Sequence, residues 1–504
     1  MTEHVDVLIV GAGLSGIGAA CRLRQEHPGK SIAILESRGA IGGTWDLFRY
    51  PGIRSDSDMF TLGFDFSPWD SPQAIADGPS IREYVERTAA EYGVDRLIRF
   101  HHRAVHAAWS TPDARWTVTA ERTDDPDAEP LTITCGLYYN CTGYYRYDEG
   151  FTPEFPGVES FEGTLIHPQH WPEDLDYAGK RIVVIGSGAT AVTLLPSLAE
   201  QAEHVTMLQR SPSYILSLPG RDPVAPIAQK VLPRKAAYAA MRWGNVLRAA
   251  AVYNLSRRAP GLVKRLVKAG VARQLPDGYD VDTHFTPRYD PWDERLCLVP
   301  DGDLFRSIRR GNASIVTDHI ETFTPTGIRL QSGRELEADI IVTATGLNLL
   351  LLGGLEIDID GKRVDLSETI GYKGLALSGV PNLIVTLGYT NASWTLKADL
   401  ISHWVCRLLR YMDEHGHRIA MPLAPPADEP THPFLDLQSG YIMRAADRLP
   451  KQGDRAPWRL YQSYPRDVRL LRRGPILDEG MSFPPVPAAD VTERDAAPRP
   501  IAAD

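Results

Sequence analysis

Two glycine-rich turns, each placed between an apolar strand and a helix, restrict the fold of this chain more than any other feature. The first turn, GAGLSG at 11–16, follows the β-branched run VDVLIV and leads into a helical pattern and a second apolar run, SIAIL. The second turn, GSGATA at 186–191, follows RIVVI and leads into the same pattern again. A strand, a glycine turn, a helix and a second strand form the βαβ unit that binds dinucleotides. Two such units predict an α/β protein with two Rossmann-like dinucleotide-binding domains.

Each position in these turns has a physical role. The first glycine allows the tight turn, the second lets a pyrophosphate approach the backbone, and the third small residue lets the helix pack closely on the strand. The helix N-terminus then presents free N–H groups to the phosphates. We therefore expect the following residues to bind the two dinucleotides: Gly11, Gly13, Ser15, Gly16, Gly186, Gly188, Ala189 and Thr190.

The residue after the second strand of each unit distinguishes the two nucleotides. Glu36 follows the first such strand, where a carboxylate accepts hydrogen bonds from ribose hydroxyls and repels a phosphate. Arg210, followed by Ser211, stands at the equivalent place in the second unit, and a guanidinium suits a 2′-phosphate. We interpret the pair as FAD and NADP(H), which implies hydride transfer into a flavin. The alternative for Arg210 is an ordinary surface cation at a strand end.

The cysteine content restricts where the electrons go next. The chain has five cysteines and no Cys-x-x-Cys pair. This argues against a disulfide reductase, a disulfide framework and a zinc site, and it is typical of a reducing cytosol. An oxidase or a monooxygenase, which passes the electrons to O2, stays open.

The charge is unevenly distributed along the chain. The net charge of −10 argues against a protein that binds nucleic acid as a whole. Residues 223–276 nevertheless hold eleven Lys or Arg and no Asp or Glu. We favour a helical insertion that covers the substrate cleft, and we keep a peripheral contact with an anionic membrane as the alternative. A nucleic-acid site in this segment is the least favoured interpretation, and an oligomer stays open.

We expect neither a signal peptide nor a membrane-spanning helix in this sequence, and we expect its last segment to be disordered. Glu3 and Asp6 stand where a signal peptide has its positive region, so we expect a cytoplasmic protein, with or without peripheral membrane association. No run of 18 apolar residues occurs that would predict a spanning helix. The last segment, 481–504, is rich in Pro and Ala, and we expect it to be a disordered tail.

A segment between the two units carries a resemblance to a known family. The sequence FEGTLIHPQHWP at 161–172 matches F-x-G-x-x-x-H-x-x-x-W-[PD], the signature of type I Baeyer–Villiger monooxygenases. The sequence GGTW at 42–45 is also similar to that family, and the resemblance covers nearly the whole chain. In the family the 161–172 segment is a hinge-like connection, so the resemblance implies that His167 ties a linker. We expect no metal site.

The resemblance implies an NADPH- and O2-dependent flavin monooxygenase. Its substrates are ketones, which it converts to esters or lactones through a C4a-peroxyflavin, and sulfides or thioamides, which it oxidises at sulfur. The alternative that we keep is a flavin monooxygenase that oxygenates nitrogen or sulfur and forms no esters.

Two charged residues match the catalytic pair of the family. An anionic peroxide needs a fixed positive charge in a site that excludes water, and arginine keeps its proton. The family's active-site arginine matches Arg295, and its partner carboxylate matches Asp56. An aspartate paired with this arginine would fix the orientation of the guanidinium.

The resemblance extends the cofactor sites but also shows one departure. Where some relatives carry a lysine that contacts the NADP 2′-phosphate, this chain has Glu294, which would leave Arg210 and Ser211 to hold that phosphate. The further flavin-site residues that the resemblance implies are Thr44, Trp45, Asp56, Thr345 and Gly346. We add Asn391, because residues 391–394 open a helix whose N-terminus could meet the electron-rich edge of the flavin ring.

These observations predict a discontinuous domain organisation. We expect an FAD-binding domain from 1–145 and 345–480, and an NADP-binding domain from 146–213 and 290–344. The helical insertion then occupies 214–289.

Overall fold

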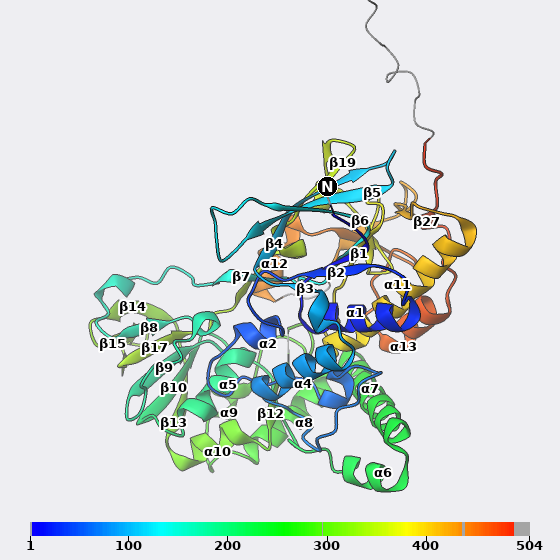
Figure 1. Ribbon diagram of the computed structural model, residues 1–504. Coiled ribbons are helices and arrows are strands. Elements are labelled where there is room, and N and C mark those ends of the chain that lie inside the picture. Colours follow the sequence, from blue (N-terminus) through cyan, green and yellow to red (C-terminus); the bar gives the residue numbers. More distant parts are fainter. Residues whose placement is uncertain (1–2, 295, 436–438, 488–504) are drawn as a thin grey trace, which may run out of the picture.

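The computed structural model describes residues 3–294, 296–435 and 439–487 (Figure 1). Two β-sheets form its framework, one in the upper and one in the lower left part of Figure 1. Arg295, which we predict to be catalytic, lies outside the described residues, as do 488–504 of the predicted tail.

The larger sheet has nine strands and contains the first glycine unit. Its order is β20-β19-β4-β5-β6-β1-β2-β3, and β23 also pairs with β6. The bounds are β1 (Glu3–Val10), β2 (Ile32–Leu35), β3 (Ile98–Arg99), β4 (His102–Ser110), β5 (Arg115–Arg122), β6 (Leu131–Asn140), β19 (Glu356–Ile359), β20 (Lys362–Arg363) and β23 (Leu383–Val385). β1 runs parallel to both β2 and β6, with Val7 opposite Ile32 on one side and Leu137 on the other. A central parallel strand is buried on both faces, which explains the unbroken apolar run in β1.

The smaller sheet is fully parallel and contains the second glycine unit. Its order is β13-β10-β9-β17-β8. The bounds are β8 (Thr164–Ile166), β9 (Arg181–Ile185), β10 (His204–Gln209), β13 (Ala313–Thr317) and β17 (Ile340–Thr343). The predicted fold class, with two Rossmann-like units, is therefore confirmed.

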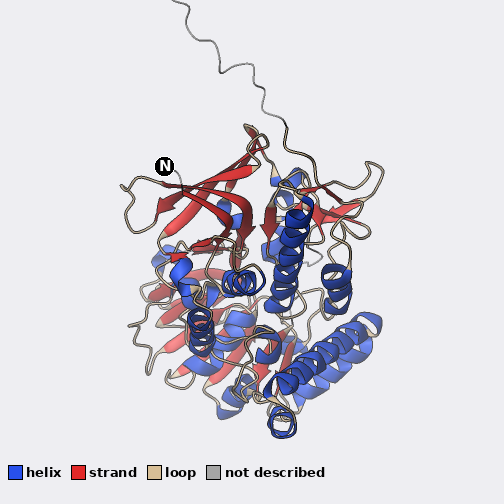
Figure 2. Cartoon of the chain, turned by 45° about the vertical axis from the view of Figure 1, so that its right-hand side comes forward, coloured by secondary structure: helices blue, strands red, loops and turns tan. Residues whose placement is uncertain are grey.

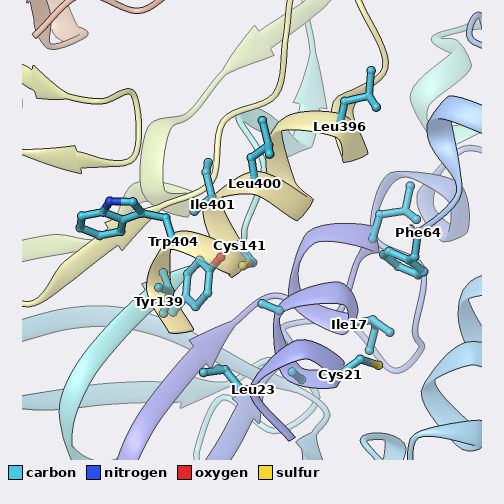
Figure 3. Close-up of a cluster of buried hydrophobic side chains, with 14 of the residues drawn as sticks. Ile17, Cys21, Leu23, Phe64, Tyr139, Cys141, Leu396, Leu400, Ile401 and Trp404 are labelled. Carbon is cyan, nitrogen blue, oxygen red and sulfur yellow. The ribbon is translucent and has the colours of Figure 1, made fainter. Parts of the chain in front are cut away.

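Helices pack against the larger sheet and contribute side chains to the buried core. α1 (Leu14–Glu26) and α11 (Trp394–His415) lie side by side against the larger sheet, although 367 residues separate them in sequence. Figure 3 shows Ile17 and Cys21 of α1, Leu400 and Trp404 of α11 and Tyr139 of β6 within one buried cluster. All five side chains are almost fully buried, so this cluster fixes the first glycine turn to the body of the protein.

Helices dominate the predicted insertion. They are α6 (Ala225–Val231), α7 (Arg234–Arg258), α8 (Pro260–Ala272) and α9 (Val281–Phe285). α7 packs against both α6 and α8, and Figure 2 shows the long helices at the outer edge of the molecule. None of the described helices is long and apolar enough to cross a membrane.

Two extended linkers connect the sheets. β7 (Tyr145–Gly150) leaves the larger sheet after β6, and β18 (Leu347–Leu349) returns from the smaller sheet after β17; the two pair antiparallel.

The C-terminal region also contributes a strand, β27 (Met481–Ser482), which pairs with β24 (Met421–Pro422). Met481 is buried, so the prediction of a disordered tail was wrong for the start of 481–504.

Candidate functional site

One cavity of about 640 Å³ is lined by residues from both glycine motifs. Of the predicted site residues, those that line it are Gly11, Gly13, Ser15, Glu36, Thr44, Trp45, Asp56, Ala189 and Thr190. The predicted residues that do not line it are Gly16, Gly186, Gly188, Arg210, Ser211, Thr345, Gly346 and Asn391. The cavity therefore joins two motifs that are 175 positions apart in the chain.

The first glycine turn is packed too closely for larger residues. Gly11 has a φ of +106°, and a Cβ built on it would lie 2.5 Å from the carbonyl oxygen of Cys141. A Cβ on Gly16 would lie 1.8 Å from the carbonyl oxygen of Gly11. Gly13 is the N-cap of α1 and supplies no side-chain cap. The free N–H groups of the first helical turn therefore face the cavity, and they fit a pyrophosphate.

Glu36 is held in place beside this turn. Its Oε2 accepts a hydrogen bond from the Ala12 N–H at 2.7 Å, and its Oε1 accepts one from the Arg38 N–H at 2.8 Å. Burial raises the pKa of the Glu36 carboxyl, and the two backbone bonds oppose this shift. Lone pairs of both oxygens stay available for the hydroxyls of a ribose.

Aromatic side chains form another wall of the cavity. Tyr144 stacks on Trp394, with the ring centroids 5.2 Å apart and the planes 1° from parallel. The indole N–H of Trp394 donates to Ser15 Oγ at 2.8 Å, which ties α11 to the first glycine motif. The hydroxyl of Tyr147 lies 3.1 Å from Thr44 Oγ1. Tyr144, Tyr147 and Trp394 were not among the predicted site residues; the cluster of tyrosines at 144–147, directly after a strand end, is the signal that the sequence offers for them.

Asp56 lies on the cavity between the two sheets. The loop that carries it also carries Arg54, whose guanidinium pairs with Asp303 of α10 (Asp303–Arg310). Asp58 caps α3 (Met59–Leu62) by accepting from the Thr61 N–H at 3.0 Å, and it also accepts from the amide of Asn245 at 2.7 Å. The loop is thus held from several sides.

The second glycine turn has the same construction as the first. Gly186 has a φ of +139°, and a Cβ on it would lie 2.3 Å from the carbonyl oxygen of Ala344. Gly188 is the N-cap of α5 (Ala189–Leu198) and also lacks a side-chain cap. Ser187 Oγ donates to the carbonyl oxygen of Ser211 at 3.0 Å. This bond places the strand end that carries Arg210 directly beside the turn.

The surroundings of Arg210 include a carboxylate. Arg210 and Ser211 are both exposed. Burial raises the pKa of Glu294, and the positive charge of Arg210 opposes that rise. A cation and a carboxylate therefore interact at the place where we expect the 2′-phosphate.

The predicted site residues that do not line the cavity have other contacts. The Thr345 hydroxyl donates to the carbonyl oxygen of Phe151 at 2.6 Å, within the linker region. The amide of Asn391 donates to the carbonyl oxygen of Gln462 at 3.0 Å, although its neighbours Tyr389 and Ala392 line the cavity.

His167 lies in the linker region as well. Its Nε2 lies 3.2 Å from the carbonyl oxygen of Gly346, and its Nδ1 accepts from the Gln169 N–H at 3.2 Å. This pattern is that of the neutral Nε2–H tautomer, and burial lowers the pKa of His167 accordingly. Across 3–294, 296–435 and 439–487 there is no group of three or more His, Cys, Asp or Glu that could hold a metal ion.

Comparison with protein families identifies two matching regions. Residues 59–351 match the family described as flavin-binding monooxygenase-like, and residues 9–74 match the NAD(P)-binding Rossmann-like domain. The predicted use of a flavin and a nicotinamide dinucleotide is confirmed by these matches together with the two glycine units.

Individual proteins of similar sequence are described as FAD monooxygenases as well. The chain is 59% identical to the FAD-containing monooxygenase EthA of Mycobacterium tuberculosis, with 97% of this chain and 99% of the relative covered. It is 56% identical to EthA of Mycolicibacterium smegmatis, over 96% and 98%. It is 47% identical to the probable FAD-binding monooxygenase AlmA of Acinetobacter baylyi, over 99% of both.

Solved structures share the fold. An oxidised steroid monooxygenase bound to NADP superimposes with a TM-score of 0.70 at 26% identity, over 84% of this chain and 88% of that one. An open cyclohexanone monooxygenase gives 0.69 at 22% identity, over 84% and 90%, and shows the fold alone. On the evidence of its sequence and its two-sheet architecture, the chain belongs to the flavin-binding monooxygenase-like family.

Proposed function

We propose that this protein is an NADPH- and O2-dependent Baeyer–Villiger monooxygenase that contains FAD. It converts a ketone, O2, NADPH and a proton into an ester or lactone, NADP⁺ and water, and it also oxidises sulfides or thioamides at sulfur. The observation that carries the proposal is the single cavity lined by both dinucleotide motifs, because hydride transfer needs the two cofactors in one enclosed space. The domain boundaries, with FAD on the larger sheet and NADP(H) on the smaller one, are part of the proposal.

The bound flavin would accept the hydride and activate O2, and the chain supplies binding, orientation and charge. The N-terminus of α1 and Glu36 bind the pyrophosphate and a ribose of FAD. The N-terminus of α5 binds the pyrophosphate of NADP(H), and Arg210 with Ser211 binds its 2′-phosphate. The stacked pair of Tyr144 and Trp394 excludes water from the cavity wall between the sheets.

Arg295 and Asp56 form the proposed catalytic pair. The guanidinium of Arg295 stabilises the negative charge that develops when oxygen is transferred to a carbonyl. Asp56, which lines the cavity, orients that guanidinium. The family resemblance and the position of Asp56 support this assignment.

A mass-spectrometric product analysis tests the proposal. The purified protein is incubated with NADPH, air and a panel of linear, cyclic and aryl ketones together with thioethers. An ester or lactone supports the Baeyer–Villiger assignment, whereas sulfoxides or N-oxides without any ester would establish the alternative monooxygenase. Absence of every oxygenated product would overturn both.

The variant Arg295→Ala tests the catalytic pair. We expect ester formation to fall by a factor of 10² or more, roughly the effect of removing one charge-stabilising donor, while NADPH oxidation to hydrogen peroxide continues. Arg288→Ala, a change of an exposed arginine on the same segment, is the matched control. Unchanged ester yield in Arg295→Ala would show that the charge comes from another residue.

A further inference from the structure

The helical insertion carries most of the exposed large apolar side chains in the described part of the chain. Ten of fifteen such side chains lie in its segment 223–276. They are Val224, Ile227, Val231, Leu232, Trp243, Leu247, Val252, Leu255, Leu262 and Leu266. Isolated exposed apolar side chains are ordinary, but a concentration on one subdomain marks an interaction surface. We call these ten residues, with the cations between them, the insertion surface.

α7 shows that this exposure follows helical geometry. Its outward positions Ala236, Ala240, Trp243, Leu247, Ala251 and Leu255 recur every three or four residues and so form one stripe. The opposite side of α7 is buried and firmly held. The buried Arg242 there donates to the carbonyl oxygen of Gly63 at 2.6 Å and to Asp399 Oδ2 at 2.7 Å. The stripe is therefore the exposed face of a helix whose opposite side is fixed.

The charge of the insertion surface has one sign. The eleven Lys or Arg of residues 223–276 face no acidic residue of their own segment. Six of them pair with carboxylates of other segments, and the other five form no ion pair within the described residues: Lys230, Lys235, Arg258, Arg265 and Arg273. These cations and the apolar side chains lie on α6, α7 and α8 or directly beside their ends, in a protein whose net charge is −10. Such local reversal of charge selects an anionic partner.

We propose that the insertion surface docks the protein onto an anionic lipid bilayer. The three helices lie in the plane of the interface, with the apolar side chains among the upper acyl segments and the cations at the headgroup phosphates. Trp243 suits this position, because its ring packs on Tyr464 at 5.4 Å while 41% of the residue is exposed. A two-fold dimer through the same face would bring like charges together, and a nucleic acid would leave the apolar stripe without a partner.

Flotation of the full-length protein with vesicles tests the proposal. Vesicles of phosphatidylcholine alone are compared with vesicles that contain about 30% phosphatidylglycerol, at rising salt concentration. We expect binding only to the anionic vesicles and a loss of binding at high salt. Lys230→Glu with Lys235→Glu should weaken the partition by more than about five-fold per cation. Ile227→Ser with Leu247→Ser should weaken it as well.

Matched controls use exposed residues elsewhere. Lys362→Glu with Lys451→Glu changes two exposed cations, and Met443→Ser with Leu477→Ser removes two exposed apolar side chains. These controls should bind like the unchanged protein, and the thermal unfolding temperature should be the same for all variants. The proposal is overturned if the unchanged protein does not float with anionic vesicles, or if the controls lose binding equally. It is also overturned if sedimentation without lipid shows an oligomer that Ile227→Ser with Leu247→Ser dissociates, since the surface then binds a second copy.

Discussion

Replacement of Arg242 by methionine should show how strongly the helical insertion is held to α11, which packs against the larger sheet. Arg242 of α7 and Asp399 of α11 are almost completely buried, with side chains 5% and 3% exposed and Nη2 2.7 Å from Oδ2. Arg242 Nη1 also donates to the carbonyl oxygens of Phe60 at 3.1 Å and Gly63 at 2.6 Å. The substitution removes all of these bonds and leaves a buried carboxylate without its cation.

The expected loss is about 3–5 kcal/mol in the free energy of unfolding, as for other buried ion pairs that lose one partner. Arg248→Met on the same helix is the control. Arg248 is exposed and its nearest carboxylate, on Asp222, is 3.6 Å away, so the expected loss is at most about 1 kcal/mol. Chemical denaturation followed by circular dichroism measures both variants.

The pH dependence gives an independent check on the cause. Burial raises the pKa of Asp399 above its unfolded value, and removal of the guanidinium raises it further. A carboxyl group with a raised folded pKa is buried in its neutral form as long as it stays protonated. The free energy of unfolding therefore falls as the pH rises from the unfolded pKa towards the folded pKa. The unchanged protein carries the same penalty up to its own folded pKa of about 7. The difference between Arg242→Met and the unchanged protein should therefore stay constant from pH 5 to about pH 7 and increase above it, by up to about 1.4 kcal/mol per unit. A loss below about 1 kcal/mol, or one independent of pH, would refute the reasoning.

Two further predictions concern the glycine turn and the linker. Gly16→Ala should displace the turn, because the new Cβ would lie 1.8 Å from the Gly11 carbonyl oxygen. The purified variant should contain at least ten-fold less flavin, measured by absorbance. The control Gly29→Ala, where no atom lies within 4 Å of the new Cβ, should retain its flavin. His167 has a lowered folded pKa, so the unfolded chain binds its proton first as the pH falls; stability should therefore decline below about pH 6.5. His167→Gln should reduce this slope in pH-dependent denaturation, and an unchanged slope would assign the titration to other groups.

The parts of the site that sequence could predict are those built from neighbouring residues. The turns at 11–16 and 186–191 need small residues because each turn approaches a nearby strand end, and the strand–turn–helix order is written directly in the chain. Glu36 and Arg210 could be located because each follows the next strand of its own unit. For the same reason the class of the fold and the type of cofactor were predictable.

The remaining parts depend on contacts between distant segments. Tyr144 meets Trp394 only because α11 returns to the first glycine motif, and no local pattern specifies that return. Asn391 was selected from its place before a helix, yet its amide donates to Gln462, a residue of the C-terminal region. Met481 was assigned to a disordered tail because the segment is rich in Pro and Ala. It is ordered because β27 pairs with β24, a strand that lies far from it in the sequence.

The geometry indicates that the signature segment 161–172 acts by contacting the two linkers that connect the sheets. The ring of His167 lies so close to Gly150 that a Cβ there would be 1.9 Å from it, and its Nε2 lies 3.2 Å from the carbonyl oxygen of Gly346. Gly150 ends β7 and Gly346 precedes β18, so His167 contacts both linkers at once. Each cofactor in our proposal is bound through its pyrophosphate to a different sheet. The relative position of nicotinamide and flavin is then determined by the two linkers, which explains why a histidine that does not line the cavity belongs to the signature of an oxygen-transferring enzyme.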